Sequence, residues 1–107
     1  MLLSAVILLI ANALAHVLQY LRMRAESAPS QEQAGVLAFA IINGLIALFL
    51  GLNLSWAEYL ALAFPLIGGV GLSLNLRNSG GSKALSYLIL ALDAALVIIF
   101  TYLLFFT

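Results

Sequence analysis

A chain of 107 residues that is 65% hydrophobic and 7% charged has too little polar surface to cover a water-soluble fold. The formal net charge is +0 and no basic cluster occurs, so nucleic acid is not an expected partner. The absence of cysteine excludes disulfides and thiolate metal sites, and the composition as a whole indicates an integral membrane protein.

Charged residues divide the chain into four apolar runs, at residues 1–21, 33–57, 59–76 and 84–107. Each run approaches or exceeds the roughly 20 residues that a helix needs to cross the hydrocarbon core of a bilayer. None shows the alternating pattern of barrel strands, which leaves helix as the state that satisfies the backbone in lipid. We predict one transmembrane domain over residues 1–107, with helices at about 1–22, 31–53, 56–76 and 83–106.

The first predicted helix carries Asn12, His16 and Gln19 at spacings of four and three residues. At about 100° per residue these side chains share one face, and polar groups in lipid turn toward protein. Interhelical hydrogen bonding is the favoured interpretation of this stripe, and a proton or cation path is the alternative. A haem held by His16 from each of two copies is a minority alternative, and no cofactor is expected. The run lacks a basic start, which favours a retained helix over a signal peptide.

The second predicted helix combines one amide, Asn43, with a stripe of small residues on which another backbone can approach closely. This predicted packing face consists of Ala40, Gly44, Ala47 and Gly51. The third predicted helix contains Pro65 near its middle, where the missing N–H and the ring predict a helix break that frees a backbone carbonyl.

Asp93 stands in the fourth predicted helix among apolar residues, nine residues past Ala84. A rise of about 1.5 Å per residue places it roughly 14 Å from the nearer membrane boundary. The same reasoning gives Asn12 and Asn43 a similar depth, so we predict a polar layer at the midplane. Three interpretations of Asp93 stay open: a neutral acid that donates a hydrogen bond to Asn12, Asn43 or a carbonyl, a group that titrates during transport, or a partner for a cation from another subunit or a ligand.

The basic residues predict the orientation of the helices. Arg22 and Arg24 follow the first run, and Arg77 and Lys83 lie between the third and fourth, so four spans place all four cations on one side. The positive-inside rule makes that side cytoplasmic and both termini non-cytoplasmic. The short connections predict an up-down-up-down bundle of two hairpins, expected in a plasma membrane such as a bacterial inner membrane. Ser82, after Gly80 and Gly81, is a candidate helix N-cap.

No nucleophile with a base, no pair of metal ligands and no large loop is visible, so an enzyme is not expected. The first functional hypothesis is a non-catalytic accessory or structural subunit of a membrane complex or homo-oligomer. Its partners would be the lipid bilayer and other membrane-protein subunits or copies of itself. The alternative is a small oligomeric proton- or cation-dependent transporter or channel that uses Asp93.

Overall fold

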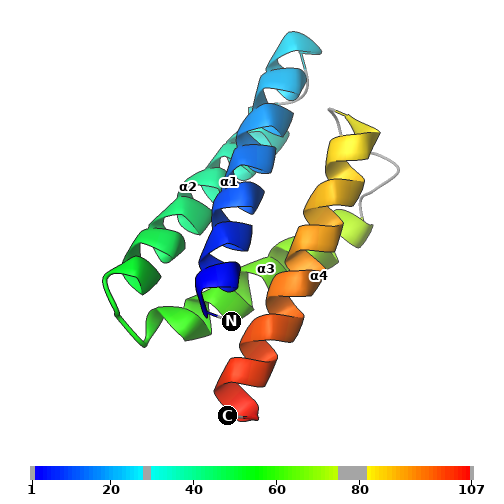
Figure 1. The fold of residues 1–107 in the computed structure, drawn as a ribbon. Coiled ribbons are helices and arrows are strands. Elements are labelled where there is room, and N and C mark those ends of the chain that lie inside the picture. Colours follow the sequence, from blue (N-terminus) through cyan, green and yellow to red (C-terminus); the bar gives the residue numbers. More distant parts are fainter. Residues whose placement is uncertain (1, 28–29, 75–81, 107) are drawn as a thin grey trace.

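The computed structural model describes residues 2–27, 30–74 and 82–106, and the regular structure in these ranges is entirely helical. Arg77, Gly80 and Gly81 lie outside the described residues. Four helices follow one another along the chain (Figure 1), namely α1 (Leu2–Ala25), α2 (Ser30–Gly51), α3 (Ala57–Leu74) and α4 (Lys83–Phe105). Arg22 and Arg24 belong to the last turn of α1.

All four helices are long and apolar enough to cross a membrane, as the sequence predicts. The shortest, α3, has 18 residues, which corresponds to roughly 27 Å at the rise of an α-helix. Large apolar side chains also cover the outer faces of the bundle: Ile7 is 57% exposed, Leu48 54% and Ile98 70%. Such faces suit a lipid environment, where apolar exposure has no hydration cost.

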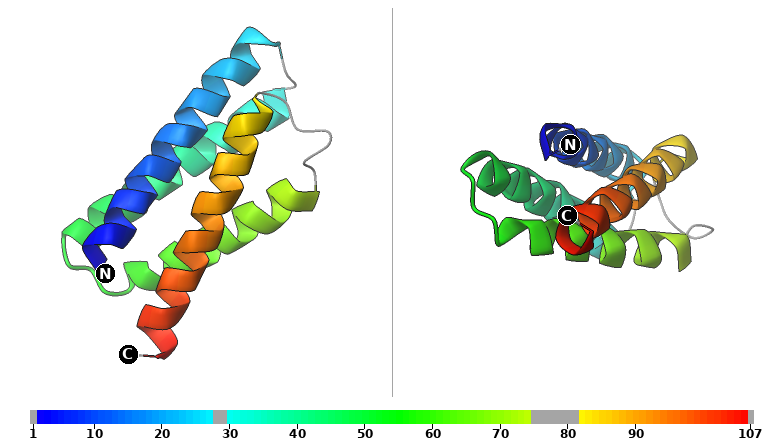
Figure 2. Two further views of the ribbon diagram at one scale, coloured as in Figure 1. Left: turned by 45° about the vertical axis from the view of Figure 1, so that its right-hand side comes forward. Right: turned by 60° about the horizontal axis from the view of Figure 1, so that its bottom comes forward.

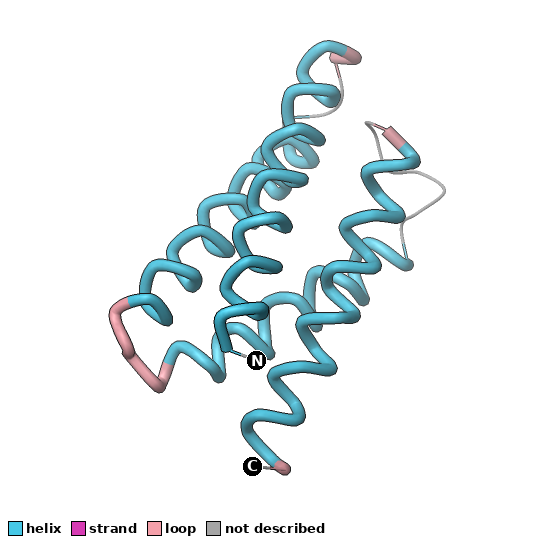
Figure 3. Tube along the Cα trace, in the orientation of Figure 1, coloured by secondary structure: helices cyan, strands magenta, loops and turns pink. Residues whose placement is uncertain are grey.

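The helix ends follow from local chemistry. Ser82 caps α4 as predicted, and its Oγ accepts a hydrogen bond from the Leu85 amide at 3.4 Å. The end of α2 is a Schellman motif, in which Asn53 has a positive φ of 63°. The Leu54 amide donates to the Phe49 carbonyl and the Asn53 amide to the Leu50 carbonyl, each at 3.0 Å. This motif produces the short connection between α2 and α3 (Figure 3).

The helices pack in the ring order α1, α2, α3, α4, with α4 closing against α1. Helices α1 and α2 run alongside each other, whereas α3 crosses α4 (Figure 2). Helical structure continues through Pro65, which lies buried inside α3, so the break predicted there does not divide the helix. Because Pro65 has no N–H, the Ala61 carbonyl one turn earlier lacks its usual donor.

One row of buried residues runs along α1 and another along α4, and we call these two rows the seams of the helices. The buried residues of each seam recur at alternating spacings of three and four, the pattern of coiled-coil contact positions. The seam of α1 contains Ala5, Leu9, Asn12, His16, Gln19 and Met23, and that of α4 contains Ser86, Ile89, Asp93, Leu96 and Phe100. Toward the chain termini these seams join an apolar core with Ile46, Leu50 and Ala61. Toward the other end the seams are mostly polar, and this half carries the candidate site.

Candidate functional site

Asp93 and Asn12 form the hydrogen bond that joins α4 to α1 inside the bundle. The Asn12 amide nitrogen, Nδ2, donates to Asp93 Oδ1 at 2.7 Å. Asn12 is fully buried and Asp93 is 4% exposed. The sequence predicted that these two residues share a layer, and the structure places them in direct contact. Asp93 therefore has a neutral partner within its own chain.

Asn43 is also buried, but its side chain bonds to its own helix. Its Nδ2 donates to the Phe39 carbonyl, one turn earlier in α2, at 2.8 Å. Among the described residues no hydrogen bond links Asn43 to Asn12 or Asp93. The side-chain carbonyl oxygens of Asn12 and Asn43 are buried, and neither has a hydrogen-bond partner among the described residues. Each is an acceptor available to a proton or a cation, since an amide oxygen carries two lone pairs.

His16 lies one turn from Asn12 along the buried seam of α1. Its Nδ1 is 2.8 Å from the Asn12 carbonyl oxygen, a distance that makes Nδ1 the protonated donor. The imidazole also stacks on the Phe39 ring of α2, with centroids 5.9 Å apart and ring planes inclined by 24°. Both contacts bury His16 inside one chain, a placement unsuited to a haem shared between copies.

Gln19 fastens the end of α1 to the start of α4. Its Nε2 donates to the Ser82 carbonyl at 3.0 Å and to Ser86 Oγ at 2.9 Å. Its Oε1 accepts from the Ser82 amide at 2.8 Å. Asn12 and Gln19 of the polar stripe predicted on α1 thus bond to α4, whereas His16 stacks on α2. Sequence reasoning missed Ser86 as a partner, although its position seven residues before Asp93 places both on one face of α4.

Two glycines of α3 lie directly against Asp93. A Cβ atom added at Gly69 would lie 3.3 Å from the Asp93 Cβ. One added at Gly68 would lie 3.6 Å from Asp93 Oδ2 and 3.2 Å from Phe39 Cε1. Glycine at both positions therefore allows α3 to approach α4 where the two helices cross, with Phe39 on the other side of Gly68.

The small-residue face predicted on α2 has a mixed placement. Ala40 and Ala47 are buried at 6% exposure, whereas Gly44 is half-buried and Gly51 is exposed. Apart from the neighbouring backbone of the same helix, no heavy atom lies within 4 Å of a Cβ added at Gly44 or Gly51. Ala40 and Ala47 are thus the buried members of this face.

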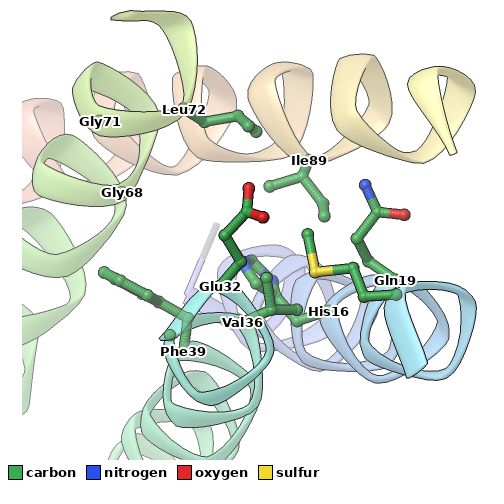
Figure 4. Close-up of a pocket in the computed structure, with 11 residues that line it drawn as sticks. His16, Gln19, Glu32, Val36, Phe39, Gly68, Gly71, Leu72 and Ile89 are labelled. Atoms are coloured by element: carbon green, nitrogen blue, oxygen red, sulfur yellow. The ribbon is translucent and has the colours of Figure 1, made fainter. Parts of the chain in front are cut away.

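A cavity of about 290 Å³ lies between the helices in the polar half of the bundle (Figure 4). His16, Gln19 and Met23 of α1 line it, together with Phe39 of α2, Gly68 of α3 and Ile89 of α4. The Glu32 side chain of α2 points into this cavity, with its carboxylate directed toward Leu72 and Ile89. Gly68 of the inner wall also lies against Asp93.

Sequence reasoning did not assign a role to Glu32. A signal was present, because Glu32, Val36, Phe39 and Asn43 recur at spacings of four, three and four and so share one face of α2. A second cavity, of about 340 Å³, lies between α3 and α4 and is lined by Pro65, Gly69 and Asp93. Asp93 thus lines the second cavity and lies against Gly68, which lines the first. No group of three His, Cys, Asp or Glu side chains suited to a metal ion occurs within residues 2–27, 30–74 and 82–106.

Comparisons with known protein families, with curated proteins and with solved structures find no match for this chain.

Proposed function

We propose that this chain is an integral membrane protein that binds a proton or cation at Asp93 and carries it between the cavity that Asp93 lines and the cavity on the other side of Gly68. The observation that carries the proposal is the position of the Asp93 carboxylate. It is buried at the contact of α1, α3 and α4, and it has a neutral amide as its hydrogen-bond partner. It lines the second cavity and lies against Gly68, which lines the first.

The orientation in the membrane is part of this proposal. Gln19 binds Ser82, so the end of α1 with Arg22 and Arg24 lies beside the start of α4 with Lys83. By the positive-inside rule this basic end faces the cytoplasm of a plasma membrane, such as a bacterial inner membrane. The four helices then cross in an up-down-up-down order with both termini outside. The short connection after the Schellman motif of α2 supports this order.

An unpaired charge near the middle of the membrane costs about 2.5 kcal/mol or more on insertion scales. Because of this cost, a carboxyl group at that depth favours a function in which it binds and releases a proton or cation. The Asn12 amide can satisfy both states of that carboxyl group. Its Nδ2 donates to the ionised form, as observed, and its Oδ1, which has no partner among the described residues, would accept from the protonated form after an amide flip. Asn12 thereby lowers the cost of changing the charge on Asp93.

The test is proton or cation flux into liposomes that contain the purified protein. Asp93→Asn conserves the shape of the side chain and removes its charge, so we expect the gradient-driven flux to fall to the level of empty liposomes. Glu58→Gln is the matched control, because it removes a carboxylate at the start of α3, far along the chain from Asp93, and it should transport normally. Equal flux in Asp93→Asn and the unmodified protein would refute the transport role.

A second candidate is the non-catalytic accessory subunit of a membrane complex or homo-oligomer. It is favoured by one observation: the hydrogen bonds of Asn12 and Gln19 to α4 are also what a purely structural bundle needs to hold its helices. Purification in mild detergent followed by mass analysis tests it. Recovery of the chain with other membrane proteins or with copies of itself, together with absent flux, would support the accessory role over transport.

A further inference from the structure

The cavity beside Glu32 has a composition that the proton or cation role of Asp93 does not explain. Its walls are mainly apolar, with Val36, Leu72 and Ile89 among them, and the Phe39 ring forms part of its inner wall. One acidic side chain, Glu32, is directed into it. No hydrogen bond or ion pair to the Glu32 carboxylate is found within the described ranges. A site for a metal ion or for water alone would be lined with several oxygen ligands instead.

From this arrangement we propose that the cavity binds a small lipophilic organic monocation, with Glu32 as its counter-charge and Phe39 as an aromatic wall. Pockets for such ligands are mostly apolar with a few polar groups that fix the orientation. An aromatic face attracts a cation through the ring quadrupole, most strongly where water is excluded. The volume of about 290 Å³ suits a compact aromatic or branched ammonium ion.

The charge balance of the cavity supports a cationic ligand over an anionic or neutral one. Arg22 and Arg24 are exposed on α1 and do not line the cavity, whereas Glu32 does. His16 contributes an imidazole whose Nδ1 lies 2.8 Å from the Asn12 carbonyl oxygen. An organic cation in the cavity would reach Gly68, which lies against Asp93. The inference that this cation is a transported substrate rests on the proposed function, whereas its binding to the cavity is measured separately.

The test uses phenyltrimethylammonium as the probe and tert-butylbenzene, which has the same shape without the charge, as its neutral counterpart. The protein is purified in detergent micelles with labelled methyl groups, and the NMR signals are followed during titration. We expect saturable shifts at Val36 and Ile89, which line the cavity, and none at Ile98, which lines the second cavity. The neutral counterpart should not produce the saturable shifts.

Glu32→Gln should weaken the affinity for phenyltrimethylammonium by about tenfold, because the counter-charge is lost while the shape is kept. Glu26→Gln is the matched control, since Glu26 is an exposed carboxylate at the same end of the bundle and does not line the cavity. Val36→Phe is an independent variant that fills the cavity and keeps Glu32, and it should abolish binding. An unchanged amide spectrum in each variant establishes that the fold is intact.

Affinity in Glu32→Gln equal to that of the unmodified protein, or shifts of the same size at Ile98 as at Val36, would overturn the inference. The outcome is independent of the proposed function, because the titration involves no gradient and leaves Asp93 unchanged. Binding without any Asp93-dependent flux would remove the transport role and keep the cation site. Asp93-dependent flux without binding would keep the transport role and remove the cation site.

Discussion

Asn12 and Asp93, 81 residues apart in the sequence, are joined by a hydrogen bond of 2.7 Å at the level where the core of the bundle changes from apolar to polar. On the terminal side of this pair, Leu9 and Leu96 are fully buried in the apolar cluster. On the other side Gln19 and Ser86 continue the contact between the same two helices. The pair therefore sets the register of α1 against α4, since a shift by one turn would break this hydrogen bond and bring the carboxyl group to the level of Leu9 or His16.

Replacing Asn12 should destabilise the bundle, and replacing Asn43 should not. Asn12→Leu removes the donor to Asp93 and leaves a buried acceptor without a partner, so we expect the free energy of unfolding in detergent to fall by about 1–2 kcal/mol. Asn43→Leu removes only a bond within α2 together with a buried oxygen that has no partner. We expect a change of less than about 0.5 kcal/mol, or a gain in stability.

Asn43→Leu is the control for Asn12→Leu, because both asparagines are buried and both are replaced by the same apolar side chain of similar size. The double variant Asn12→Leu with Asp93→Leu should recover most of the lost stability, because no unpaired polar group then remains at the pair. Equal losses from Asn12→Leu and Asn43→Leu would contradict the assignment of the interhelical bond to Asn12.

Glycine at position 69 should be required for the crossing of α3 and α4. Gly69→Ala brings a methyl group within 3.3 Å of the Asp93 Cβ, which cannot move without moving α4. Gly71 lies two residues away in the same helix, and the methyl group of Gly71→Ala would have no atom of another helix within 4 Å. Both changes gain similar helix propensity, so their difference isolates the packing. We expect Gly69→Ala to be less stable than Gly71→Ala by about 1 kcal/mol in thermal or denaturant unfolding, and identical stabilities would argue against the close approach.

Gln19 should protect the first turn of α4 from opening. Gln19→Leu removes its hydrogen bonds with Ser82 and Ser86, so the amides of Leu85 and Ser86, which donate to Ser82, should exchange with deuterium faster. Amide exchange followed by NMR is the measurement. Leu18→Ala, at a neighbouring position that is 53% exposed, is the control and should leave these amides protected. Unchanged exchange in Gln19→Leu would mean that the cap of α4 holds without α1.

Several site residues could be found from the sequence because their type is unusual for their surroundings. Asp93 and the stripe of Asn12, His16 and Gln19 stand out in apolar runs, and counting residues from the boundaries gave Asp93 and Asn12 a common depth. The same depth did not identify the partner, because Asn43 has it too and bonds instead within α2. Depth is a property of position along one helix, whereas pairing also depends on how each helix is rotated.

The residues that the sequence did not identify depend on contacts between helices. Glu32 is a charge near a helix start, where solvent exposure is the ordinary expectation, and only the packing of α1, α3 and α4 beside it forms the cavity that it lines. Gly69 resembles the other glycines of α3 until the crossing with α4 places it against Asp93. We predicted a helix break at Pro65 from its residue type, but the helical structure of α3 continues through it.

The sequence by itself determined that this protein has four helices able to cross a membrane and where the polar side chains lie along them. Hydrophobicity and segment length are summed along the chain, so they can be read without knowing any contact. The tertiary structure decided that Asn12 rather than Asn43 pairs with Asp93, that Gln19 holds the start of α4, and that Glu32 faces a cavity. These outcomes depend on the rotation and crossing of the helices, which the packing of side chains from all four helices sets together.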